Sequence, residues 1–166
     1  MHVSPPTLQI RGARVSDAAR VAHCYLASRK TLLSFAPLPH PDAEVVAWVR
    51  DVLLPTGGVT MALESGAVLG LIAMSERDGS HWVDQLYVHP ARMRRGVGAT
   101  LLQLQLGRLQ GTVRLYCFEP NRGARTFYEK HGFKAIGFGD GSTNESHCPD
   151  VLYEREAQRD GSARQA

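Results

Sequence analysis

Residues 86–102 read LYVHPARMRRGVGATLL, in which a strand-like run leads through a glycine-bearing turn directly into a helical pattern. The first N–H groups of a helix lack intrahelical partners, and together with the positive end of the helix dipole they attract anions. Gly96 and Gly98 let a ligand approach the backbone closely, while Arg94 and Arg95 add positive charge. The stretch predicts a phosphate-binding turn, with an ordinary helix start as the alternative.

Two common nucleotide-binding patterns do not fit this turn. A dinucleotide-binding fingerprint needs a third glycine, where this chain has Leu101, and it directly follows the first strand. A nucleoside-triphosphate loop needs Gly-Lys-Ser/Thr, whereas Gly98 is followed by Ala99 and Thr100. A helix dipole contributes up to about 2 kcal/mol and micromolar affinity needs about 8, so an anionic ligand must gain most of its affinity elsewhere.

The N-terminal part of the chain predicts a strand followed by two helices. Residues 8–14 alternate like an edge strand, and Ser16 is the expected N-cap of a helix whose buried stripe includes Ala18, Ala22 and Tyr25. Three prolines make residues 34–41 a loop. Beyond it a second helix is expected to end at Pro55, with a helical row formed by Val45, Val49 and Val52.

The central part of the chain predicts three strands and a buried helix. Residues 58–64 and 68–76 form an expected hairpin around a Ser65-Gly66 turn, and residues 81–88 form the next strand. A helix over residues 97–109 is then expected from two apolar rows at i, i+4, i+7, namely Val97, Leu101 and Leu104, and Leu102, Leu106 and Leu109.

The C-terminal part predicts a strand over residues 112–118, a helix over residues 121–131 ended by Gly132, a strand from Phe133 and a short strand near residues 151–153. This order of elements predicts an α/β (α+β) fold, with a mixed, mostly antiparallel twisted sheet flanked by helices on both faces. One domain is expected over residues 1–156, with a disordered tail over residues 157–166.

Composition narrows the classes of function. The formal charge of +3 arises from 19 basic and 16 acidic residues without long like-charge runs, which does not indicate nucleic-acid binding. Cys24, Cys117 and Cys148 show neither paired nor metal-ligand spacing, so free thiols in a reducing compartment are expected. No signal peptide or membrane span is evident, so we expect a soluble, cytoplasmic protein without a metal site. The sequence leaves the oligomeric state open, with a homodimer as one alternative.

Two blocks together, residues 86–102 and NRGARTFYEKHGF (residues 121–133), resemble the GNAT acetyltransferase superfamily. The family turn reads Gln/Arg-x-x-Gly-x-Gly/Ala, which places Gly96 and Gly98 at its small positions and Met93 where the family has Gln or Arg. The surrounding element order fits the family from about residue 8 to residue 153. The resemblance implies the GNAT-like acyl-CoA N-acyltransferase fold with acetyl-CoA (coenzyme A) as cosubstrate.

The resemblance also implies roles for individual residues. Asn121 would contact the pantetheine arm, and the Tyr128 hydroxyl would protonate the departing thiolate; from the residues alone, an N-cap and a core aromatic are equally good interpretations. Backbone groups of the preceding strand would line the pantetheine, and the turn would hold the pyrophosphate: these residues are Leu86, Tyr87, Val88, Arg94, Arg95, Gly96, Val97, Gly98 and Ala99.

The base and the acceptor have weaker signals. An alkyl amine with a pKa near 10.4 is neutral about once in 2,500 molecules at pH 7, so a lysine-like acceptor needs a base. Asp84 shares a strand face with Leu86 and Val88 and is the first candidate, with a structural role as its alternative. Some family members place a glutamate base near this position, but the equivalent residue of this chain, two positions before Asp84, is Trp82. Glu119, Glu145 and Asp150 are further candidates.

Two functions remain in competition at this stage. The first is an N-acetyltransferase that acylates a small-molecule amine or a peptide amine by direct attack, so that Cys117 is a packed thiol and not a nucleophile. The second is a non-catalytic acyl-CoA-binding sensor or interaction module on the same fold. The polar or proline-rich loops at residues 34–41 and 140–150 are candidate walls of the acceptor site.

Overall fold

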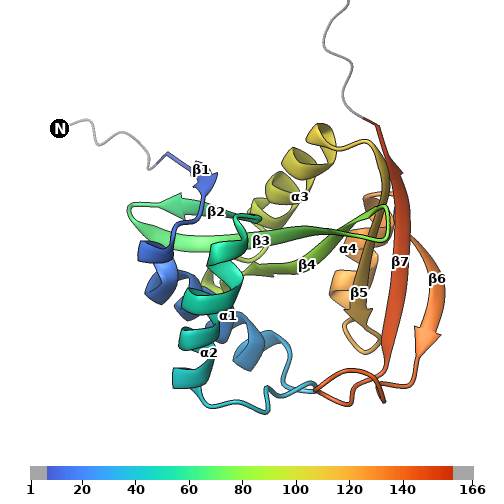
Figure 1. Ribbon diagram of the computed structural model, residues 1–166, viewed down its shortest axis with the longest axis horizontal. Helices are drawn as coiled ribbons and strands as arrows, with labels where there is room; N and C mark the ends of the chain where they lie inside the picture. Colours follow the sequence, from blue (N-terminus) through green and yellow to red (C-terminus); the bar gives the residue numbers. More distant parts are fainter. Residues whose placement is uncertain (1–6, 159–166) are drawn as a thin grey trace, which may run out of the picture. The chain divides into compact units, whose positions relative to one another are not determined.

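The computed structural model describes residues 7–158 and contains one seven-stranded sheet with the strand order β1-β2-β3-β4-β5-β7-β6 (Figure 1). The pairs β1–β2, β2–β3, β5–β7 and β6–β7 are antiparallel, whereas β4 and β5 are parallel. This arrangement confirms the expected mixed, mostly antiparallel fold. The strands are β1 (Gln9–Gly12), β2 (Val59–Glu64), β3 (Ala67–Arg77), β4 (Ser80–Val88), β5 (Gly111–Phe118), β6 (Lys134–Gly139) and β7 (Asp150–Ala157).

Four α-helices and several short helical turns connect these strands. The helices are α1 (Ala18–Leu32), α2 (Asp42–Trp48), α3 (Val97–Arg108) and α4 (Arg122–Lys130). Contacts divide the described chain into two compact units: unit 1 comprises residues 7–73 and 85–101, and unit 2 comprises residues 74–84 and 102–158. One domain over residues 1–156 stays a prediction. Within the described residues, no helix is long and apolar enough to cross a membrane.

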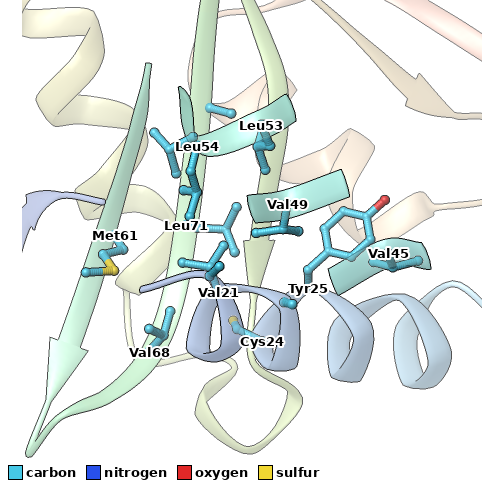
Figure 2. Close-up of a cluster of buried hydrophobic side chains, with 14 of the residues drawn as sticks. Val21, Cys24, Tyr25, Val45, Val49, Leu53, Leu54, Met61, Val68 and Leu71 are labelled. Carbon is cyan, nitrogen blue, oxygen red and sulfur yellow. The ribbon is translucent and has the colours of Figure 1, made fainter. Parts of the chain in front are cut away.

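The core of unit 1 lies between α1, α2 and one face of the β2–β3 hairpin (Figure 2). Side chains of directly paired residues share a face of the sheet, and Met61 pairs with Leu71. Both are fully buried and belong to the same cluster as Val21 of α1. Buried Ala18, Ala22 and Tyr25 confirm the stripe expected for the first helix.

The opposite face of the hairpin carries the first turn of α3. Gly70 is adjacent to Leu71 and therefore points away from the α1 side. A Cβ atom at Gly70 would lie 2.9 Å from Val97 Cγ1 and 3.0 Å from the Tyr87 carbonyl oxygen. Glycine at this position lets α3 and β4 approach β3 closely, so unit 1 has helices on both faces of its strands.

Two expectations about the N-terminal helices were wrong. Ser16 lies inside a 3₁₀ turn, η1 (Val15–Asp17), and is not the N-cap of α1. The second helix changes after α2 into a π-helical turn, η2 (Val49–Leu53), and a 3₁₀ turn, η3 (Leu54–Thr56), so Pro55 does not end it. The backbone hydrogen bonds of a π-helix join residues i and i+5, so its turn contains one residue more than the turn of an α-helix. This change places Leu53 in the core and leaves Val52 56% exposed.

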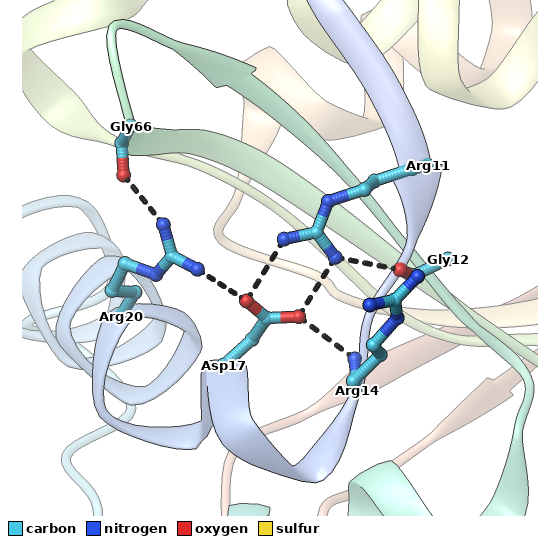
Figure 3. Close-up of polar contacts among 6 residues, drawn as sticks. All are labelled: Arg11, Gly12, Arg14, Asp17, Arg20 and Gly66. Atoms are coloured by element: carbon cyan, nitrogen blue, oxygen red, sulfur yellow. Dashed lines mark hydrogen bonds and ion pairs between the residues drawn. The ribbon is translucent and has the colours of Figure 1, made fainter.

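A buried carboxylate ties the N-terminus of unit 1 to the hairpin turn (Figure 3). Asp17 is 2% exposed and accepts two hydrogen bonds from Arg11, at 2.8 and 3.0 Å, and one from the Arg14 N–H, at 2.8 Å. Arg20 donates to the same carboxylate and to the carbonyl oxygen of Gly66, the latter at 3.0 Å. These bonds hold the pKa of Asp17 well below its usual range, chiefly through Arg11.

Unit 2 is built around β5 and β7, which pair along their whole lengths from Gly111↔Ala157 to Phe118↔Asp150. The last strand is therefore longer than the expected residues 151–153, because β7 matches the full length of β5. It includes Ala157, the first residue of the expected tail; residues 159–166 lie outside the described residues. Gly132, with φ +84°, follows the end of α4 as expected.

Candidate functional site

The expected phosphate-binding turn lies in unit 1 between η4 (Pro90–Arg92) and α3. Arg94 and Gly96 both adopt left-handed backbone conformations, with φ of +63° and +77°. The Gly96 carbonyl oxygen accepts hydrogen bonds from the N–H and the hydroxyl of Thr100, at 2.9 and 2.8 Å, which fixes the first turn of α3. Residues 93–96 are exposed, so a helix N-terminus with a glycine-bearing approach faces solvent.

The arginines beside the turn differ in what they contact. Arg95 lies 3.4 Å from a carboxylate oxygen of Glu64, whose side chain is only 11% exposed, and Arg92 reaches the same carboxylate at 4.0 Å. Glu64 therefore balances part of the positive charge next to the turn, a feature that sequence reasoning missed. Arg94 is exposed.

The strand residues expected beside the pantetheine arm lie at the end of β4. Leu86, Tyr87 and Val88 are all half-buried. The Tyr87 ring packs edge-on against Tyr25 of α1, with centroids 4.9 Å apart, and belongs to the rim of the hydrophobic cluster. The structure therefore places the Tyr87 side chain against the core, and the backbone role of the three residues stays a prediction.

Asn121 and Tyr128 lie at the start and near the end of α4 in unit 2. The Asn121 side-chain oxygen accepts a hydrogen bond from the Ala124 N–H at 3.2 Å, which confirms the N-cap interpretation. Tyr128 is 8% exposed, and its ring packs against Phe133 and Tyr153, with centroids 5.8 and 6.3 Å away. The core-aromatic interpretation is correct for the ring, and the role of the hydroxyl stays a prediction.

A polar network that sequence reasoning missed fastens α4 to β7. The Tyr153 hydroxyl donates to Glu129 at 2.8 Å and accepts from the Arg125 Nε–H at 3.1 Å. Burial is the largest cause of a raised pKa of Tyr153, so this phenol stays protonated at neutral pH. Its partners are 24 and 28 residues away in sequence, a separation at which no local pattern could have identified them.

The candidate base Asp84 lies in unit 2 and is engaged in an ion pair. One of its oxygens accepts from Arg77 at 2.7 Å, and the same guanidinium lies 4.5 Å above the ring of Trp82. Trp82 in turn stacks on Tyr116 at 5.6 Å. These contacts favour the structural alternative for Asp84, and its role as a base stays a prediction.

The other candidate bases lie on loops of unit 2. The Asp150 carboxylate accepts from Asn144 at 3.1 Å, and Asn144 also bonds Cys148, which orders residues 140–150. Glu145 lies in this loop, and the Glu119 carbonyl oxygen accepts from Arg125. The described residues contain no group of three or more His, Cys, Asp or Glu side chains that could hold a metal ion.

The cysteines are all buried. Burial raises the pKa values of Cys24 and Cys117 to about 12. Both thiols are therefore protonated at neutral pH and are poor nucleophiles. The expectation that Cys117 is a packed thiol agrees with its burial in β5.

An open mixed sheet with a glycine-bearing turn at the start of α3 defines an acyl-CoA N-acyltransferase fold. The acetyltransferase (GNAT) family model matches residues 26–133, which is more than half of the 166-residue chain, so the chain belongs to the GNAT acetyltransferase family. No curated protein matches it in sequence.

Solved structures of this family resemble the chain closely in fold and weakly in sequence. A GNAT-family acetyltransferase from Bacillus cereus has a TM-score of 0.72 at 14% identity, covering 92% of this chain and 99% of that one. PaiA N-acetyltransferase from Thermoplasma acidophilum, in complex with coenzyme A, has a TM-score of 0.68 at 19% identity, covering 90% of this chain and 99% of that one. The ribosomal-protein-S18-alanine N-acetyltransferase from Escherichia coli has a TM-score of 0.71 at 14% identity, covering 96% of this chain and 100% of that one.

Proposed function

We propose that this protein transfers an acetyl group from acetyl-CoA to a primary amine by direct attack. The observation that carries the proposal is the exposed turn at residues 93–96, which leads into the N-terminus of α3 in a chain of the GNAT family. The structural neighbour solved with coenzyme A supports the choice of cosubstrate. The acceptor is a small-molecule amine or a peptide amine.

In the proposed complex the cofactor's pyrophosphate lies at the first turn of α3. The backbone N–H groups of residues 96–99 donate to its oxygens, and Arg94 and Arg95 add positive charge. Met93 cannot make the contact that a Gln or Arg side chain would make, so backbone donors carry more of the binding. Leu86, Tyr87 and Val88 offer backbone groups to the pantetheine arm, and Asn121 contacts it from the start of α4.

The proposed reaction needs no covalent enzyme intermediate. The amine nitrogen attacks the thioester carbonyl, the C–N bond forms, the C–S bond breaks, and the thiolate of coenzyme A leaves. Tyr128 supplies a proton to that sulfur, which is chemically reasonable because a thiol has a pKa near 8.5 and a phenol near 10. The protonated Cys117 is not required in this scheme.

The attacking amine must also lose a proton. Asp84 is the proposed base from the sequence, but its ion pair with Arg77 occupies one carboxylate oxygen. The second oxygen, acting directly or through water, is the route left for Asp84 in this scheme. An acceptor with an α-amine, whose pKa is near 8, needs this help less than a lysine-like amine does.

The test is thiol release from acetyl-CoA across a panel of polyamines, aminoglycosides, amino acids and peptide N-termini, followed by Tyr128→Phe on the best acceptor. Loss of a general acid lowers turnover roughly 100- to 10,000-fold with a small effect on cofactor affinity. Tyr116→Phe is the matched control, because it removes a hydroxyl from a side chain that is 59% exposed.

The outcomes separate the two functions. If Tyr128→Phe keeps wild-type turnover but melts at a lower temperature, the hydroxyl is structural and another group protonates the thiolate. If the wild-type protein binds acetyl-CoA but acylates nothing in the panel, the acyl-CoA-binding sensor becomes the better account. The packing of Tyr128 among aromatic rings is the observation that keeps this second function in view.

A further inference from the structure

Unit 1 contains a cavity of about 390 Å³ between the first turns of α1, the start of β3 and η4. Its volume falls in the range of small-molecule sites, roughly 300–1,000 Å³. Ten residues line it; four of them are arginine or histidine, and none of the ten is acidic. None of the residues proposed above to bind coenzyme A lines the cavity. Its basic lining residues are Arg20, His23, His89 and Arg92.

Arg20 is held in place by the Asp17 cluster. It donates to the Asp17 carboxylate and to the Gly66 carbonyl oxygen, and Gly66 is itself part of the cavity wall. A guanidinium has five N–H donors, and these two hydrogen bonds use two of them. Asp17 is also paired with Arg11, so one buried carboxylate balances two guanidinium groups and leaves one net positive charge at this end of the cavity.

Arg92 and the two histidines supply further donors. Arg92 lies 4.0 Å from Glu64, a long ion pair that leaves the guanidinium, with its side chain 41% exposed, able to turn to a closer anion. His89 Nδ1 accepts from the Ala91 N–H at 3.2 Å, so a neutral His89 carries its proton on Nε2 and donates from there. His23 stacks on His89 with ring centroids 5.7 Å apart.

The remaining wall is apolar and is made of short side chains. Val68 and Leu69 are buried at the start of β3, and three alanines complete the lining. A site with basic groups and a short hydrocarbon surface fits a molecule that has an anionic end and a small apolar body. We propose that this cavity binds a small organic anion, a carboxylate or a phosphate monoester, independently of coenzyme A.

The test is an NMR titration of the full chain saturated with coenzyme A, at constant ionic strength, with acetate, butyrate and inorganic phosphate as probes. Saturation keeps the probes away from the turn at residues 93–98. If the protein does not bind coenzyme A, the same titration is run on the free protein. There the amide signals of Gly96 and Gly98 report binding at the turn, and those of Ala19, Ala67 and Ala91 report binding in the cavity. Failure of the proposed function is thereby distinguished from failure of this proposal.

The expected result is that butyrate or phosphate shifts the cavity amides in a saturable way, with butyrate binding more tightly than acetate. Arg92→Gln and His23→Gln each weaken the probe that binds by about tenfold, which corresponds to about 1.4 kcal/mol. Arg108→Gln is the matched control, since Arg108 is exposed and lies in unit 2. Absence of saturable shifts with all three probes overturns the proposal, as does unchanged affinity in both cavity variants. A phosphate response without a butyrate response shows that the cavity takes phosphates and not carboxylates.

Discussion

Replacing Gly70 by alanine tests how the turn is positioned. The new Cβ would lie 2.9 Å from Val97 Cγ1, 3.0 Å from the Tyr87 carbonyl oxygen and 3.4 Å from Leu101 Cδ1. Side-chain atoms can rotate away, but a backbone oxygen cannot, so α3 or the end of β4 must move by a few tenths of an ångström. Both elements belong to the proposed coenzyme A site, so the variant should affect stability and binding together.

The size of the effect follows from the packing. Overpacking a close contact costs about 1–3 kcal/mol, and the stiffer unfolded chain offsets about 0.4–1 kcal/mol of it. The net loss of roughly 1–2 kcal/mol lowers the melting temperature of a chain of this size by about 2–8 °C. A displaced first turn of α3 should weaken coenzyme A binding about tenfold, which calorimetric titration measures directly.

Gly12→Ala is the control, because its Cβ would meet nothing closer than the Val59 carbonyl oxygen at 4.0 Å. That variant should keep both the melting temperature and the affinity. A Gly70→Ala protein that melts like the wild type would refute the packing argument. One that is destabilised yet binds coenzyme A with unchanged affinity would show that the position of α3 does not govern the cofactor.

Two further predictions concern unit 1 and the thiols. Asp17→Asn should lower the free energy of unfolding by about 3 kcal/mol, measured by urea unfolding, because a buried carboxylate with several partners is lost. In the folded protein the pKa of Asp17 lies below its ordinary value near 3.8. The contribution of the ionised carboxylate to the free energy of unfolding is therefore complete above pH 3.8 and is lost as the pH falls through the lowered pKa. The stability of the wild type should drop more steeply than that of the variant between about pH 5 and pH 2. Cys24 and Cys117, with pKa values raised to about 12 by burial, should react with a chromogenic aromatic disulfide only after unfolding, and rapid labelling of the native protein at neutral pH would contradict their burial.

Features set by local chemistry could be predicted from the sequence. The Ser65-Gly66 turn has both residues at positive φ, +51° and +80°, as a tight two-residue hairpin requires. The Asn121 cap follows from the preference of its side chain for the first N–H groups of a helix. In these cases, neighbouring residues in the chain determine the conformation.

Features that depend on distant residues or on a change of helical period could not be predicted. The π-helical turn at Val49–Leu53 shifted the buried position to Leu53, although the row Val45, Val49 and Val52 fits an α-helix. Arg20 contacts Gly66 across 46 residues, and no periodic pattern links these two positions. For the candidate site, the sequence predicted the turn, but it gave no indication that Asp84 would be paired with Arg77.

Gly98→Asp tests whether the turn before α3 binds the cosubstrate of an acetyl transfer. The substitution places a carboxylate and a Cβ where the pyrophosphate should approach the backbone. We would measure acetyl-CoA binding by calorimetric titration in wild type and variant, with folding of both checked by thermal melting. We expect a wild-type binding isotherm with one site, and binding weakened at least tenfold, by about 1.4 kcal/mol, in a folded variant. Equal affinity in the two folded proteins, or no binding by the wild type, would contradict binding at this turn.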